Sequence, residues 1–274
     1  LLYKKYHSNN IESNKYIDEL TQLLKKSESY RDSMNTYTAM KDHYVHLGHI
    51  KQSYEYVEKI SDMHRKKYGR LSSMNTLLST YQIYIFKQLN MMDSVKTYID
   101  YYADNSVAPY DNRVPYLKCK YYLYMENYDM LAATIDAAEE GYAEFWVQCY
   151  KYKIGYLRGK VLESEGKHHD ALNTYIESLS LNPTHYELRK AIGKVHRIIG
   201  DYDKSVEIFK KLLLPSPRSG ILNLEIAKSY YTGGYMQKAL EHLETALEIW
   251  ENADTIYKPA IEAREKWIEW NQIN

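Results

Sequence analysis

Cysteine, proline, glycine and phenylalanine are scarce in this chain of 274 residues, which has 2 Cys, 6 Pro, 11 Gly and 3 Phe. Two cysteines exclude a disulfide framework. So few glycines and prolines favour helices over a turn-rich sheet protein. No apolar run reaches the roughly 18 residues that a membrane-spanning helix requires, so the sequence predicts no membrane span.

Net charge is also lacking, because 36 Lys and Arg residues balance 36 Asp and Glu residues. Nucleic-acid-binding proteins usually carry an excess of basic charge, so this balance predicts no nucleic-acid partner. Hydrophobic residues form 45% of the chain, which is enough for a sizeable core and argues against wholesale disorder. The 31 tyrosines, together with many Lys and Asn residues, are typical of an AT-rich, bacterial genome.

The C-terminal half repeats with a period of 34 residues and without a gap. Each unit has two helical apolar stripes separated by a glycine, and in two units a proline follows, which cannot continue a helix interior. Such short helix pairs bury their apolar faces only by stacking on neighbouring pairs. The repeating positions are Gly159 and Gly193; Gly166, Gly200 and Gly234; Ala171, Ser205 and Ala239; Tyr175, Phe209 and Leu243; Leu179, Leu213 and Leu247; and Pro183 and Pro217.

Small and large residues in this repeat predict how the helices pack. Gly159 and Gly193 fall in the middle of the first helix, where glycine costs about 1 kcal/mol relative to alanine. We expect them to let the two helices of a pair approach closely. The large residues at 175, 209 and 243 would then fill the gap towards the next unit.

This pattern resembles the tetratricopeptide repeat family, most clearly over residues 152–253. The resemblance implies an all-α fold, a right-handed superhelical solenoid of antiparallel helix pairs. The sequence departs from the family pattern where an early Trp is replaced by Gly155, Arg189 and Asn223.

The domain organisation follows from the same rhythm. We expect three tetratricopeptide units at 152–253 and a capping helix at 254–274, apolar on one side, with Trp250, Trp267 and Trp270 packed there. Residues 34–140 predict degenerate hairpins of the same kind, with Gly48 and Asn90 as turn residues, or alternatively a distinct all-helical domain. In residues 1–33 we expect an N-terminal helix or a partial repeat.

Catalytic motifs are missing: there is no Gly-x-Ser-x-Gly elbow, no P-loop and no His-Glu-x-x-His. We therefore expect no catalytic residues, no cofactor and no enzymatic activity. His43, His46 and His49 recur every three residues and could suggest a metal site, but no converging Cys or carboxylate is evident, so we expect no metal. Cys119 and Cys149 lie on predicted helices without a His neighbour at catalytic spacing, and Cys119 replaces a small packing residue.

Candidate ligand-binding residues come from the resemblance, because the first helix of each tetratricopeptide hairpin lines the concave face. Basic residues exceed acidic ones at these positions, which favours an acidic ligand, and tyrosine adds apolar and hydrogen-bonding contact. The alternative is an ordinary solvated helix face. The predicted groove residues are Arg113, Tyr116, Lys120, Lys153, Tyr156, Lys160, Lys190, Lys194, Arg197, Lys228 and Tyr231.

Two functions remain open from the sequence. The first is a non-catalytic scaffold that binds a peptide or protein segment in a basic, tyrosine-containing concave groove. The second is a sensor or regulatory region of a larger enzyme, kinase or transcription regulator, which the start at Leu1 rather than Met favours. Unpaired cysteines are compatible with the cytoplasm or the periplasm, and the oligomeric state stays open.

Overall fold

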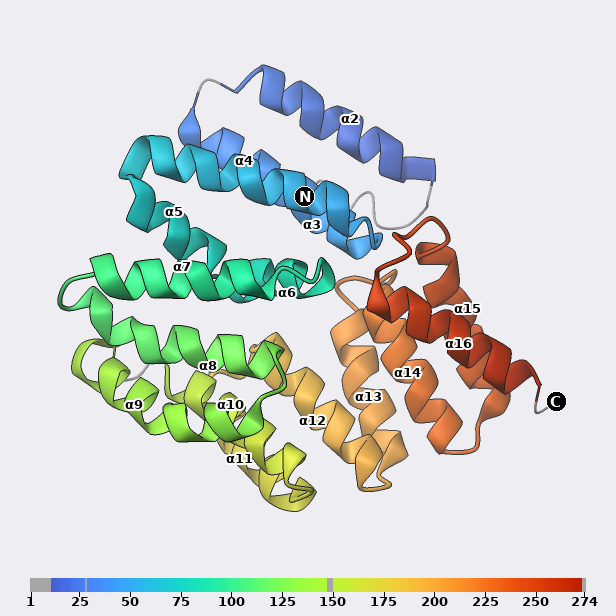
Figure 1. Cartoon of the computed structure of the whole chain (residues 1–274). Helices are drawn as coiled ribbons and strands as arrows, with labels where there is room; N and C mark the ends of the chain where they lie inside the picture. Colours follow the sequence, from blue (N-terminus) through green and yellow to red (C-terminus); the bar gives the residue numbers. More distant parts are fainter. Residues whose placement is uncertain (1–10, 28, 147–149, 273–274) are drawn as a thin grey trace. The chain divides into compact units, whose positions relative to one another are not determined.

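The structure, a computed structural model, describes residues 11–27, 29–146 and 150–272, and these residues form helices joined by turns, with no β-strand among them (Figure 1). None of the described helices is long and apolar enough to cross a membrane. The elements are α2 (Ile11–Lys25), α3 (Tyr30–His46), α4 (Ile50–Tyr68), α5 (Arg70–Leu77), α6 (Thr80–Gln88), α7 (Met92–Asn105), the 3-10 helix η1 (Tyr110–Arg113), α8 (Val114–Tyr124), α9 (Tyr128–Trp146), α10 (Lys151–Ser164), α11 (His168–Leu181), α12 (Tyr186–Ile198), α13 (Tyr202–Leu213), α14 (Gly220–Thr232), α15 (Met236–Ile249) and α16 (Lys258–Asn271).

Consecutive helices pack as pairs: α3 with α4, α6 with α7, α8 with α9, α10 with α11, and α14 with α15. The chain divides into two compact units. Unit 1 comprises Leu1–Thr76 and Lys210–Asn274, and unit 2 comprises Leu77–Phe209. The all-α solenoid of antiparallel helix pairs expected from the sequence is confirmed.

The turns inside the pairs carry residues with a left-handed backbone. Gly166, Gly200 and Gly234 have φ of 75°, 88° and 82°. Asn90 and Glu126 hold the corresponding place in two earlier pairs, both with φ of 57°. Glycine adopts this conformation without a steric penalty, and asparagine tolerates it better than most residues. The 34-residue spacing of glycines therefore marks the helix–turn–helix units, as predicted.

Glycines in the first helices allow the close approach that the sequence predicted. A Cβ atom on Gly193 would lie 2.8 Å from Cζ of Phe209, and one on Gly159 would overlap the ring of Tyr175. Both rings are fully buried. Tyr175 also belongs to a core cluster with Leu188 and other apolar residues of α12, so one ring joins the two helices of its own pair to the next pair.

Helix α16 caps the last pair of unit 1. It packs against α15, and its Ala260, Ala263 and Trp270 are buried. The Trp270 ring stacks on Tyr231, with ring centroids 4.2 Å apart and an interplanar angle of 7°. The predicted capping helix is confirmed, although Trp267 is only half-buried.

Segments some 200 residues apart in sequence meet within unit 1, at the turn between α3 and α4. The indole Nε1 of Trp250 donates to the carbonyl of His46 at 3.2 Å. The backbone N–H of Asp254 donates to the carbonyl of Gly48 at 3.0 Å, and its Oδ2 accepts from the N–H of Lys51 at 2.9 Å. Asp254 thus caps the N-terminus of α4, where His49 makes no side-chain cap.

Candidate functional site

Helices α8, α10 and α12 lie in unit 2, and α10 packs against both of the others. Residues three and four positions apart share one face of a helix, so each helix presents a row of the predicted positions. We call the resulting set the α8–α10–α12 surface. It comprises Arg113, which ends η1, and Tyr116, Lys120, Tyr124, Lys153, Tyr156, Lys160, Glu163, Glu187, Lys190, Lys194 and Arg197.

Aromatic rings gather where α10 and α12 begin. Nζ of Lys153 lies 4.3 Å from the ring centroid of Tyr150 and 6.0 Å from that of Tyr116 on α8, distances at which a ring face attracts a cation. The ring of His185, just before α12, lies 4.8 Å from Tyr152 and 6.4 Å from Tyr156. These contacts place the three helices side by side along one surface.

The groove residues predicted from the sequence did not include Tyr150, Tyr152 and His185. His185 lies outside α12 and caps it, because its Nδ1 accepts from the N–H of Leu188 at 3.2 Å. A polar residue placed directly before a predicted helix is the signal that could have identified it. Tyr150 holds the same place before α10.

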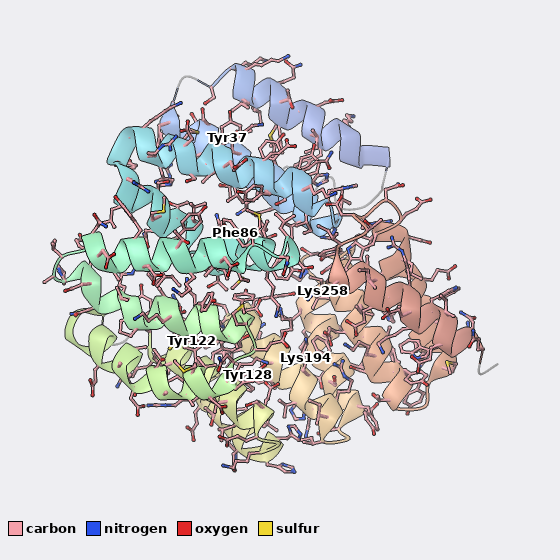
Figure 2. The ribbon with its side chains drawn as sticks, viewed as in Figure 1. Tyr37, Phe86, Tyr122, Tyr128, Lys194 and Lys258 are labelled. Atoms are coloured by element: carbon pink, nitrogen blue, oxygen red, sulfur yellow. The ribbon has the colours of Figure 1, made fainter. Side chains whose placement is uncertain are left out.

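Lysines and glutamates also pair along α10 and α12. Nζ of Lys160 lies 2.8 Å from Oε1 of Glu163, and Nζ of Lys190 lies 2.8 Å from Oε2 of Glu187. The hydroxyl of Tyr175 also donates to Glu163. Figure 2 marks Lys194, which lies on α12 in the same row as Lys190.

The pKa values at this surface reflect burial and the nearby lysines. Burial has the largest effect on Lys160 and lowers its pKa; Glu163 opposes this, while Lys194 and Lys190 lower it further. Burial would raise the pKa of Glu187, but Lys190 and Lys194 outweigh it, so the pKa falls and the carboxylate stays ionised. Seven of the twelve surface residues are basic and two are acidic, so the surface is positive although the whole chain is neutral.

Two predicted positions on α8 are used inside unit 2. Lys120 is 7% exposed, and its ammonium donates to the carbonyl of Leu78. The hydroxyl of Tyr124 donates to the carbonyl of Thr80 at 3.1 Å. Burial, together with Arg113 and Lys153, lowers the pKa of Lys120 to about 7. Lys120 and Tyr124 therefore hold α8 against the segment that leads into α6.

Lys228 and Tyr231 lie on α14 of unit 1, and the capping helix engages both. Nζ of Lys228 lies 2.7 Å from Oε1 of Glu262, and Tyr231 stacks on Trp270. The two residues belong to unit 1, whereas the α8–α10–α12 surface belongs to unit 2.

The histidine and cysteine candidates have structural surroundings. His43 is 2% exposed and packs 5.0 Å from the ring of Tyr16. Within the described part of the chain, no three His, Cys, Asp or Glu side chains are arranged to hold a metal ion. Cys119 is fully buried, and burial raises the pKa of its thiol to about 12. Cys149 lies outside the described residues.

Comparisons with known proteins agree with this architecture. The family model of the tetratricopeptide repeat matches residues 153–185. The chain is similar to a chain of the APC/C hetero-tetramer Cut9-Hcn1, with 17% identity and a TM-score of 0.52 over 92% of this chain and 46% of that one. It is also similar to TTC0263, a thermophilic protein of Thermus thermophilus, with 15% identity and a TM-score of 0.53 over 70% of this chain and 95% of that one. No curated protein matches the chain.

The paired helices and their left-handed turns define an α-solenoid repeat protein. The matched model and the two related folds confirm the resemblance to the tetratricopeptide repeat family, and residues 153–185 form one repeat of that family. The chain spans less than half the length of the Cut9-Hcn1 chain that it matches.

Proposed function

We propose that this chain is a non-catalytic interaction scaffold whose α8–α10–α12 surface forms a concave groove for an acidic peptide or protein segment. Tetratricopeptide repeat proteins are generally non-catalytic scaffolds, and their fold suggests protein or peptide partners. One observation supports the proposal for this chain: besides Lys120 and Tyr124, which are bonded inside unit 2, three neighbouring helices carry six basic residues and two tyrosines at these positions.

The charged part of the surface favours carboxylates in the ligand. Lys160 and Lys190 already pair with glutamates, yet Lys194 adds a third ammonium that acts on both Lys160 and Glu187. A ligand carboxylate would offset the repulsion among these lysines. Because they are partly buried, salt screens the attraction less than at an open surface.

The aromatic part of the surface favours an apolar or aromatic neighbour of the acidic residue. Burial raises the pKa of Tyr116 and Tyr156, so both hydroxyls remain protonated donors at neutral pH. Tyrosine offers a large contact area at a small entropic cost, which suits a binding surface. The expected ligand therefore combines acidic and aromatic or aliphatic residues.

Selection from a random peptide library displayed on phage, with the immobilised chain as bait, tests this function. We expect the recovered peptides to be enriched in Asp and Glu beside Tyr, Phe or Leu, and their affinity to fall as NaCl rises. A recovered set with no excess of acidic residues, or affinities that salt leaves unchanged, would contradict the proposed ligand class.

A further inference from the structure

A cavity of about 300 Å³ lies in unit 1, beside the turn between α3 and α4. Its polar lining residues are Asp18 of α2, His43 and Tyr44 of α3, His49 and Gln52, and two aliphatic side chains complete it. This volume is at the lower end of the range of small-molecule sites. None of these residues belongs to the α8–α10–α12 surface.

The lining of the cavity combines aromatic rings with polar side chains. His43 is 2% exposed. The Tyr44 ring lies 6.0 Å from His43 and 6.2 Å from His49, in edge-to-face arrangements. Asp18 and Gln52 are exposed. A ligand in the cavity would therefore lie beside both a carboxylate and aromatic rings.

The one Asp, Glu, Lys or Arg residue in the lining of the cavity is acidic. Asp18 is the one carboxylate in its lining. Burial has the largest effect on His49 and lowers its pKa, against the opposing influence of Asp254, so His49 is neutral at pH 7. Glu55 acts on the hydroxyl of Tyr44. The nearby ammonium of Lys41 does not line the cavity and lies 3.2 Å from Asp42, so the field at the site favours a cation.

We propose that this cavity binds a small organic ammonium ion, whose nitrogen pairs with Asp18 and whose apolar part lies against the rings of Tyr44 and His49. A charge-assisted hydrogen bond would hold the nitrogen, and packing against the aromatic rings would hold the apolar part. A bare metal ion does not fit, because the described residues offer no set of three donors for one. The chemical class is therefore a primary or secondary amine with a short apolar group.

Three probes of one shape test the proposal: phenethylammonium, the neutral 2-phenylethanol and the anion phenylacetate, titrated by isothermal calorimetry at pH 7. We expect saturable 1:1 binding of phenethylammonium, with 2-phenylethanol at least about tenfold weaker. Phenylacetate should not bind below about 10 mM. No saturable binding of the ammonium, or equal binding of the alcohol or the anion, would overturn the proposal.

Conservative variants locate the binding to this cavity. Asp18→Asn keeps the shape and removes the charge, so phenethylammonium should bind only as weakly as 2-phenylethanol. Tyr44→Phe keeps the ring and should retain affinity, whereas Tyr44→Leu should lose it. Glu58→Gln removes one exposed charge elsewhere on α4 and is the matched control. Unchanged binding in Asp18→Asn, or an equal loss in Glu58→Gln, would overturn the assignment.

Discussion

Helices α10 and α12 in unit 2 and helix α14 in unit 1 present the same repeat positions in different ways. Lys160, Lys194 and Lys228 recur at the 34-residue period. Lys160 pairs with Glu163 of its own helix, whereas Lys228 lies 4.0 Å from Glu225 of its own helix and pairs more closely with Glu262 of the capping helix. The next helix along, α12, adds lysines beside Lys160, while α16 brings a carboxylate against Lys228. A repeat position alone therefore does not decide whether a lysine contributes to a basic surface.

The largest loss of stability is expected from removing the ring of Trp270, which stacks on Tyr231 of α14. Trp270→Ala deletes a side chain that is 1% exposed, and the cavity and lost transfer energy should lower the free energy of unfolding by about 3–5 kcal/mol. Urea denaturation followed by circular dichroism measures the loss. Trp267→Ala, at a half-buried site on the same helix, should cost clearly less, and equal losses in the two variants would contradict the assigned cap.

The lowered pKa of Lys120 in unit 2 should make the stability of the chain depend on pH. That pKa is about 7 in the folded chain and about 10.4 in an unfolded chain. Between these values the unfolded chain holds more protons, so the Lys120 contribution favours folding increasingly as pH rises. Wild-type stability should therefore rise relative to Lys120→Met between about pH 7 and pH 9.5, by up to about 3 kcal/mol. Denaturation of both proteins across this range measures it; parallel curves would contradict the shifted pKa.

Adding one methyl group at Gly159 tests how closely α10 approaches α11. Gly159→Ala places a Cβ into the Tyr175 ring, and overpacking should cost about 1–3 kcal/mol, partly offset by the better helix propensity of alanine. Adding Tyr175→Leu should relieve the overlap, so the double variant should lose less than the sum of the two single losses. Strict additivity in denaturation experiments would argue against the contact.

Breaking the ion pair between Lys228 and Glu262 should have the smallest effect on stability. Glu262→Gln removes a half-exposed partner, so the free energy of unfolding should fall by less than about 1 kcal/mol. The loss should shrink in high salt. Glu265→Gln, at an exposed position of α16, is the control. A loss of several kcal/mol in Glu262→Gln alone would show that the pair contributes more than an exposed ion pair.

The repeat units could be predicted from sequence because their signals are local. Each turn requires a left-handed backbone, which Gly166, Gly200 and Gly234 adopt. A Cβ atom on Gly159 or Gly193 would collide with the ring packed against it. Each requirement recurs every 34 residues, so the period identifies the pairs without knowledge of distant contacts.

The tertiary contacts of individual residues could not be predicted in this way. The bond from Lys120 to the Leu78 carbonyl depends on the irregular segment before α6, which has no repeat signature. The cap that Asp254 provides for α4 joins segments some 200 residues apart, and the stacking of Trp270 on Tyr231 depends on where α16 lies. Such contacts follow from tertiary packing rather than from the period.

If the basic α8–α10–α12 surface holds an acidic ligand, reversing the charge of three of its residues should weaken binding. The tightest peptide from the library would be titrated, by fluorescence anisotropy, into the wild type, Lys190→Glu/Lys194→Glu/Arg197→Glu and the charge-matched control Lys118→Glu/Lys151→Glu/Lys167→Glu. The control residues are exposed lysines of unit 2 outside the surface. We predict a loss of at least about 30-fold in the first variant and less than about threefold in the control, with unchanged circular dichroism. Equal affinities of the two variants would contradict the claim.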